Sequence, residues 1–197
     1  TGSASGPESP DVGRYARLMI HDGTEFIAYY DAAQGNLKLA SGSSGSWDIE
    51  VVDEGTDEAG SGNVGAWPDM IFSGEDLLIA YQDVDNGDLR VARGKPGSTW
   101  TSTVVDNGTE MGADARIFLD GNTAGVYYFD GYNNDLRLAR VSNGDWATET
   151  VAGDEEALGY HIDPVLDGDT RYVACYNFTN RNIWFILYIH RINRTRH

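Results

Sequence analysis

Charged side chains recur at one position of an internal repeat, and they are the first candidates for a polar site. The position lies four residues after a recurring glycine, and its occupants are Arg17, Asp69, Arg116 and Asp163. Because an isolated buried charge is costly, charges of alternating sign around one axis should pair with one another. We expect these four side chains to line a central channel and mostly to neutralise each other, with a small polar site at the channel mouth as the functional alternative.

A second recurring position holds short polar side chains at the start of a turn. Asp31, Asp83, Asp130 and Asn177 occupy it, and such residues usually cap hairpin turns. Asp83, Asp85 and Asp88 also resemble the start of a calcium loop, because Ca²⁺ prefers six to eight oxygen ligands. The bidentate acid that ends an EF-hand loop is missing, so calcium stays a weak prediction and no other cofactor is expected. The four capping residues are retained as ligand-binding candidates.

Aromatic residues form a third set. Trp47, Trp100 and Trp146 recur with the repeat, so they are expected to pack between structural units. Trp67 and Trp184 lie outside that column, which makes them the better candidates for stacking against a ligand such as a sugar. No metal-ligand spacing of histidines, phosphate loop or nucleophile elbow is present, and no catalytic residue is assigned.

The elements that would position these residues follow from the repeat itself. Gly65, Gly112 and Gly159 are 47 residues apart, and Gly13 begins a first copy with longer insertions. Each copy contains four short apolar or alternating segments separated by Asp, Asn and Gly turns, which is typical of a β-propeller blade. The sequence predicts an all-β propeller of about four blades with four antiparallel strands each, in one domain over 1–197. The repeats run from about 13–64, 65–111, 112–158 and 159–197.

One turn resembles a known motif. Gly97-Ser98-Thr99-Trp100 is similar to the end of the Asp-box of sialidase-like propellers, with Arg93 and Lys95 in place of its Ser and Asp. The wider repeat is similar to blades of large secreted bacterial propeller proteins. This resemblance implies a propeller over about residues 13–189. Because the sialidase arginine triad has no third match beside Arg17 and Arg116, no catalytic role is carried over.

Composition narrows the partners and the compartment. The 197 residues include 31 acidic and 14 basic ones, a net charge of −17, which disfavours binding to nucleic-acid phosphate. The single cysteine, Cys175, lies in an apolar run and is expected to be a buried hydrophobic residue. No apolar stretch is long enough for a membrane span. We expect a secreted protein, extracellular or periplasmic, with a carbohydrate or protein ligand.

The last copy differs from the others. It ends in an apolar run and four arginines, and the tryptophan column falls on Asn193. Two interpretations stay open: a closed four-bladed ring completed by residues near Ala4–Pro10, or part of a larger ring. In the second case the fourth repeat and the termini would form a homo-oligomer.

Three functions are carried forward. The first is a non-catalytic secreted binding or structural propeller whose ligand is a carbohydrate, a cation or a protein; this function is favoured over an enzyme, although enzyme activity stays open. The second is a sialidase-like glycoside hydrolase. The third is an inactive fragment of a larger extracellular protein.

Overall fold

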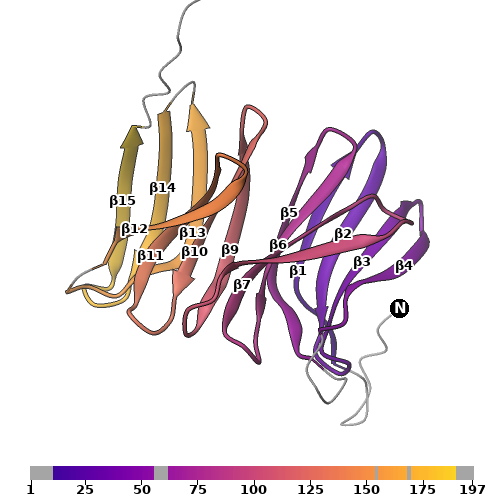
Figure 1. The fold of residues 1–197 in the computed structure, drawn as a ribbon, viewed down its shortest axis with the longest axis horizontal. Coiled ribbons are helices and arrows are strands. Elements are labelled where there is room, and N and C mark those ends of the chain that lie inside the picture. The colour runs from indigo at the N-terminus through magenta and orange to yellow at the C-terminus, as the bar shows by residue number, and fades with distance from the viewer. Residues whose placement is uncertain (1–10, 56–61, 154, 168–169, 190–197) are drawn as a thin grey trace, which may run out of the picture.

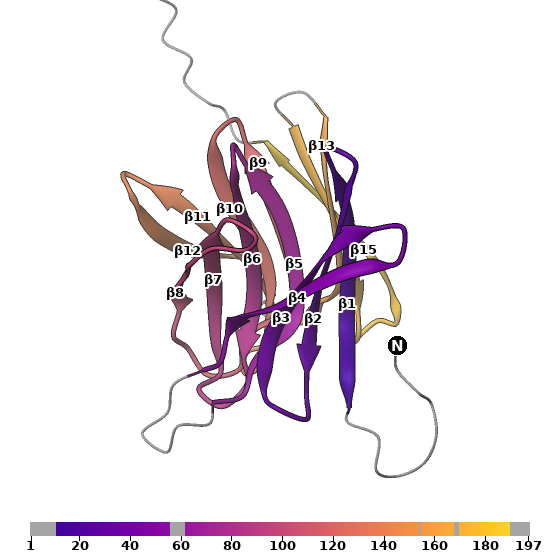
Figure 2. The ribbon, with the colours of Figure 1, turned by 90° about the vertical axis from the view of Figure 1, so that its right-hand side faces the viewer.

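The computed structural model describes residues 11–55, 62–153, 155–167 and 170–189, and every regular element in them is a β-strand. The strands form four separate sheets that stand side by side as successive blades (Figures 1 and 2). The strands are β1 (Val12–His21), β2 (Thr24–Asp31), β3 (Asn36–Ser43), β4 (Ser46–Asp53), β5 (Val64–Ser73), β6 (Asp76–Asp83), β7 (Asp88–Gly94), β8 (Trp100–Asp106), β9 (Met111–Asp120), β10 (Thr123–Asp130), β11 (Asp135–Ser142), β12 (Asp145–Ala152), β13 (Leu158–Asp167), β14 (Thr170–Asn177) and β15 (Asn182–Ile189).

Each blade is an antiparallel meander in chain order. The orders are β1-β2-β3-β4, β5-β6-β7-β8, β9-β10-β11-β12 and β13-β14-β15. The first strands of neighbouring blades contact one another, so β1, β5, β9 and β13 form the inner layer. The prediction of an all-β propeller is confirmed. The fourth blade has three strands among the described residues, and Ala4–Pro10 and Asn193, on which its completion was predicted to depend, lie outside them.

The blades are held together by apolar side chains that alternate between the two faces of each sheet. Leu37 and Leu39 of β3 lie in one core cluster with Met70 and Ile79 of the second blade. Equivalent clusters lie between the second and third blades and between the third and fourth. Cys175 is buried in the last cluster, as expected. Each inner blade therefore buries one face on its predecessor and the other on its successor.

The recurring glycine allows the inner strand of one blade to approach the backbone of the preceding blade closely. Gly65 has a φ of +104°, and a Cβ added there would lie 2.6 Å from the Cα of Leu37 in the preceding blade. Gly112 has the same relation to Leu89, with a φ of +92° and a distance of 3.0 Å. A side chain at either position would meet backbone as well as an unfavourable φ. The 47-residue glycine column thus marks the places where one blade crosses the next.

A polar clamp also recurs between blades. Asp53 at the end of β4 accepts hydrogen bonds from the Tyr81 hydroxyl and, at 2.7 Å, from Ser102 of the second blade, and Arg90 lies 3.5 Å away. Asp106 at the end of β8 repeats this with Tyr128 and with Arg137 at 3.1 Å. Burial and the neighbouring aspartate raise the pKa of both tyrosines far above its usual range. We call this arrangement the Asp–Tyr–Arg clamp.

We predict that Gly65→Ala lowers the free energy of unfolding by about 2–4 kcal/mol, because it adds a clash with Leu37 to the cost of the positive φ. Gly74→Ala is the matched control. Gly74 also has a positive φ of +64°, but no atom lies within 4 Å of its added Cβ, so its cost should be about 1 kcal/mol. Urea denaturation measures both. Equal losses would show that blade crossing does not require the glycine.

Candidate functional site: the channel mouth

All four inner strands contain a β-bulge at the same place, two to four residues after the recurring glycine. In each, one extra residue interrupts the register with the second strand, as between Arg14 and Arg17 on β1. The residue two positions after the glycine adopts a positive φ in every blade: Tyr15 (56°), Trp67 (55°), Asp114 (50°) and His161 (54°). For residues with a Cβ this conformation is strained, and bulges of this kind commonly re-aim side chains next to functional sites.

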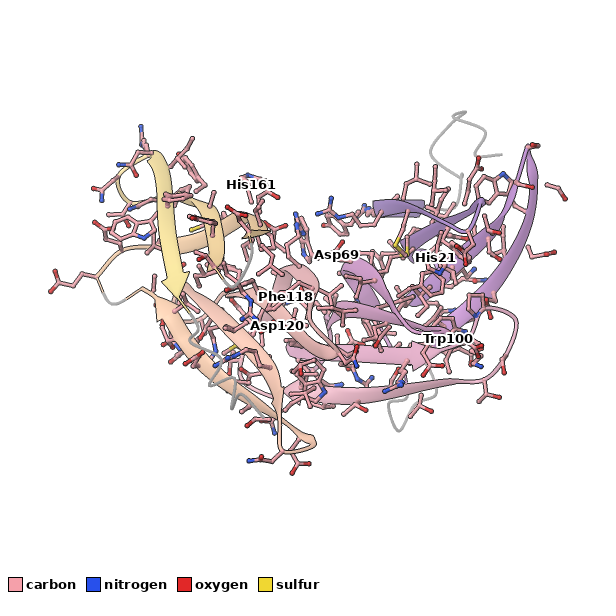
Figure 3. All side chains as sticks on the ribbon, turned by 90° about the horizontal axis from the view of Figure 1, so that it is seen from above. His21, Asp69, Trp100, Phe118, Asp120 and His161 are labelled. Carbon is pink, nitrogen blue, oxygen red and sulfur yellow. The ribbon has the colours of Figure 1, made fainter. Side chains whose placement is uncertain are left out.

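These four residues meet around one pocket of about 270 Å³. The pocket is also lined by Arg17 and Arg116, so every blade contributes to it. The rings of Tyr15 and Trp67 are stacked with their centroids 3.9 Å apart. Seen from above, Asp69 and His161 lie toward the middle of the molecule, whereas Trp100 lies near its periphery (Figure 3). Aromatic rings beside converging charged groups are common features of sugar-binding sites.

Two carboxylates lie in this inner layer, each bonded to the next blade. Asp69 accepts a hydrogen bond from the Ile117 backbone N–H at 2.9 Å and lies 3.6 Å from the Arg17 Nε. Asp114 accepts one from the Ile162 N–H at 2.9 Å and pairs with Arg116 at 2.6 Å. Both aspartates therefore join neighbouring blades. Asp114 lines the pocket, whereas Asp69 lies behind the lining and contacts it through Arg17.

The environment of Asp69 favours its protonated form. Burial raises the pKa of this carboxyl above its ordinary value, and the Ile117 N–H, Arg17 and Arg116 offset the effect only in part. A carboxyl group with a raised pKa keeps its proton to a higher pH than a carboxyl group in water.

The predicted channel set is brought together in part. Arg17, Asp69 and Arg116 lie in the inner layer, but Arg116 pairs with Asp114 rather than with Asp69 or Asp163. Asp163 is exposed and makes no ion pair among the described residues. Sequence reasoning found Trp67 but missed Tyr15, Asp114 and His161. These three residues occupy the same repeat position as Trp67, so the repeat could have identified them. However, the residue type at this position differs from blade to blade, whereas neighbouring positions of the repeat keep theirs.

The recurring turn residues lie elsewhere and cap hairpins. Asp130 is fully buried and accepts hydrogen bonds from the Tyr132 and Asn133 backbone N–H groups at 3.1 and 2.8 Å. Asp31, Asp83 and Asn177 are likewise buried and hold their own turns. Their oxygens thus have internal partners. Trp184 lies on β15 opposite Cys175, away from the pocket lining.

The weak calcium prediction rested on Asp83, Asp85 and Asp88. Within the described ranges, no group of three or more His, Cys, Asp or Glu side chains could hold a metal ion. Asp83 instead accepts from Asn86 and lies 3.3 Å from Arg90. The described residues also form no helix that is long and apolar enough to cross a membrane.

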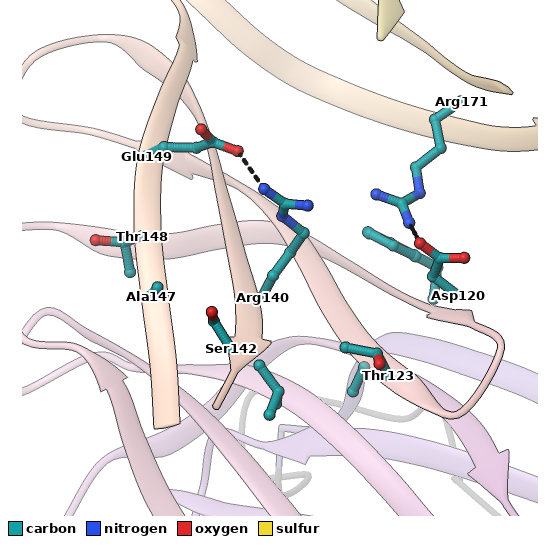
Figure 4. A pocket seen from close by; sticks show the side chains of 11 residues that line it. Asp120, Thr123, Arg140, Ser142, Ala147, Thr148, Glu149 and Arg171 are labelled. Atoms are coloured by element: carbon teal, nitrogen blue, oxygen red, sulfur yellow. Dashed lines mark hydrogen bonds and ion pairs between the residues drawn. The ribbon is translucent and has the colours of Figure 1, made fainter. Parts of the chain in front are cut away.

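A larger cavity of about 460 Å³ lies between the third and fourth blades (Figure 4). Arg171 on β14 is almost completely buried there, bonded to Asp120, with its guanidinium carbon 4.6 Å from the centre of the Phe118 ring. Its Nε and Nη1 atoms have no hydrogen-bond partner within the part of the chain that the structure describes. Arg140 and Glu149 form a second ion pair at 3.1 Å. In the second and third blades the Arg171 position holds Leu77 and Ala124, so this arginine stands where those two blades have an apolar residue.

Comparisons with known proteins support the architecture. A scan against protein-family models and a search of curated proteins find no match. Among solved structures, the catalytic domain of a GH62 α-L-arabinofuranosidase from Coprinopsis cinerea is similar with a TM-score of 0.65 at 16% identity, over 93% of this chain and 66% of that one. An α-L-arabinofuranosidase from Podospora anserina gives 0.63 at 14% identity, over 98% and 68%. An α-L-arabinanase from Penicillium chrysogenum gives 0.67 at 12% identity, over 91% and 63%.

At these identities the likeness concerns the fold, and the chain spans about two thirds of the length of these structures. The comparisons nevertheless correct one expectation. The prediction of a non-catalytic binding or structural propeller is wrong, because the three solved structures named above are glycoside hydrolases. The propeller part of the family resemblance is confirmed, whereas no finding supports its Asp-box or sialidase-like part.

We predict that Asp69 makes folding stability fall as pH rises. Its folded pKa is raised above the ordinary value of 3.8, so the folded state holds the proton more tightly than the unfolded state. The resulting stabilisation is complete below that ordinary value and is lost as pH rises through the folded pKa. Asp69→Asn keeps an acceptor for Ile117 but cannot ionise, so its stability relative to the parent should increase as pH rises above 3.8. Thermal unfolding across pH checks this, and a constant difference would contradict it.

The buried arginine of the larger cavity yields a second prediction. Replacing a buried ion pair by apolar residues is often neutral or stabilising by about 1–4 kcal/mol. We expect the double substitution Arg171→Leu and Asp120→Ser, which copies Leu77 and Ser73 of the second blade, to leave the unfolding free energy equal or up to about 3 kcal/mol higher. Arg171→Leu alone is the control, because it leaves Asp120 unpaired. A double variant less stable than this control would contradict the expectation.

Proposed function

We propose that the chain is a glycoside hydrolase that binds its sugar at the channel mouth. The observation that carries this proposal is the set of four equivalent bulges, which direct one residue from every blade into one pocket. Strained backbone repeated around a site, with stacked aromatics and two carboxylates beside it, fits a site for chemistry better than a structural plug.

The two carboxylates would divide the reaction. Asp69, whose pKa burial raises, would donate its proton to the glycosidic oxygen as that bond breaks. Asp114, paired with Arg116 as a carboxylate, would take a proton from the water that attacks the anomeric carbon. The stacked pair of Tyr15 and Trp67 would hold a sugar ring, and His161 would contact it from the opposite blade.

The substrate class follows from the neighbours. The similar structures include α-L-arabinofuranosidases, an α-L-arabinanase and an exo-β-1,3-galactanase from Phanerochaete chrysosporium, so arabinose- and galactose-containing glycans are the first substrates to test. Such polymers lie outside the cell, which agrees with the proposed extracellular or periplasmic location. A sialoside is the substrate that the sialidase-like alternative requires.

The test compares hydrolysis of arabino-oligosaccharides, β-1,3-galacto-oligosaccharides and a fluorogenic sialoside by the purified chain. We expect turnover of one of the first two and none of the sialoside. Asp69→Asn should lower kcat by about 10²–10⁴-fold, because it removes the transferable proton but keeps the Ile117 hydrogen bond. Trp67→Ala should raise KM more than it lowers kcat, since it removes ground-state stacking.

Asp163→Asn is the matched control, because this aspartate shares the column of Asp69 but is exposed and has no ion pair with a pocket-lining arginine among the described residues, whereas Asp69 lies 3.6 Å from Arg17. It should retain full activity. Saturable sugar binding without turnover, or equal losses in Asp69→Asn and Asp163→Asn, would overturn the assignment.

A further inference from the structure

The Asp–Tyr–Arg clamp gives each blade two complementary edges. The outer strand of one blade ends in the aspartate, and the next blade presents the tyrosine and the arginine as a cross-strand pair. That pair is Tyr81 with Arg90 in the second blade and Tyr128 with Arg137 in the third. A blade that carries the pair is therefore prepared to receive a carboxylate from its predecessor.

The first blade carries the same pair without a described predecessor. Tyr29 on β2 lies opposite Lys38 on β3, in the same register as Tyr81 and Arg90. Lys38 binds Asp31 and Gln34, each at 2.6 Å, as Arg90 binds its own turn aspartate. The Tyr29 hydroxyl has no hydrogen bond among the described residues, whereas the Tyr81 hydroxyl has two.

The apolar face around this pair is also uncovered. Leu18, Ile27, Ala40 and Ile49 form one row across all four strands of the first blade. Met70 and Ile79, the equivalents of Leu18 and Ile27 in the second blade, are 7% and 0% exposed because the first blade covers them. In the first blade Leu18 is 66% exposed and Ile27 is half-buried; at the other end of the row Ile49 is 64% exposed, whereas the small Ala40 is buried. The first blade thus presents both the apolar row and the polar pair of an occupied junction.

The junction between the third and fourth blades shows that the pair accompanies its carboxylate. There the aspartate position is Gly153, where a Cβ would collide with Asp135, and the tyrosine and arginine positions are Cys175 and Trp184. All three members of the clamp are replaced together. The chain therefore does not keep the tyrosine and the basic residue where no aspartate meets them, and their presence in the first blade points to a carboxylate partner.

A second copy of this chain does not fit the requirement. Its fourth blade has the other uncovered face, with Ile183 and Phe185 exposed at the positions where Leu89 and Val91 are buried. However, residues 178–197 contain no aspartate or glutamate. Asp53 and Asp106 are already occupied in their own clamps. A copy docking through its fourth blade could cover Leu18 but could not complete the clamp.

We infer that the outer face of the first blade is a docking site for a further blade of the same repeat, whose outer strand ends in an aspartate that meets Tyr29 and Lys38. The apolar row of Leu18, Ile27 and Ile49 supplies the contact area, and the pair of Tyr29 and Lys38 selects the register. This inference is independent of the proposed hydrolase activity.

The first test uses the chain as it is. Tyr81→Phe removes a hydroxyl that is bonded to Asp53, so Tm should fall by about 2–4 °C. Tyr29→Phe removes a hydroxyl with no acceptor, so Tm should change by less than about 1 °C. Equal losses would overturn the inference, because they would show that the chain itself or a second copy already supplies the carboxylate. A dimer that Leu18→Lys abolishes would overturn it as well.

The second test supplies the blade. A duplicate of residues 64–110, which ends in Asp106 and its own linker, is fused ahead of Val12, so that Glu110 precedes Val12 as it precedes Met111 in the parent. We expect a higher Tm than that of the parent, and a Tyr29→Phe loss that now equals the Tyr81→Phe loss. Asp106→Asn in the added copy alone should make Tyr29→Phe silent again. An added blade that leaves Tyr29→Phe silent, or that does not fold onto the chain, would overturn the inference.

Discussion

Face-to-face burial between successive sheets is the constraint on which the rest of the structure depends. A four-stranded sheet with apolar residues on both faces cannot be stable alone, and each blade here covers one face of the next. Tight approach requires glycine where an inner strand crosses Leu37 or Leu89. At the first two junctions the Asp–Tyr–Arg clamp then fixes the register, because a buried carboxylate must meet its hydroxyl and guanidinium partners.

The same packing creates the channel mouth. Inner strands that follow glycine at a positive φ return to the sheet through a bulge, and the bulge directs Tyr15, Trp67, Asp114 and His161 toward the axis. Asp69 and Asp114 are held by backbone N–H groups of the following blades. Their positions therefore depend on how neighbouring blades sit. The elements that stabilise the ring also determine the geometry of the candidate acid and base.

The repeat made the fold predictable, and it made the site harder to see. Columns such as Gly65 and Gly112, or Asp83 and Asp130, keep their type because every blade has the same structural need there. Asp114 and His161 share a column that has no such need, so periodicity gives no reason to select them. The pairing of Arg116 with Asp114 could not be predicted from the sequence either, because the bulge changes the side-chain direction that regular alternation predicts. Trp67 was selected because it lies outside the column of repeating tryptophans.

The first and fourth blades each have an uncovered face, and each also lines the candidate site. Tyr15 and Arg17 belong to β1 and His161 to β13, so the two blades with uncovered faces each form part of the pocket wall. The inner blades hold Trp67 and Asp114 between two neighbours, whereas each end blade is fixed from one side only. A further blade seated on the first blade would restrict the wall that faces His161. Catalytic groups tolerate only displacements well below 1 Å from their productive positions. Covering Leu18 and Ile49 would therefore change how firmly the pocket holds a sugar.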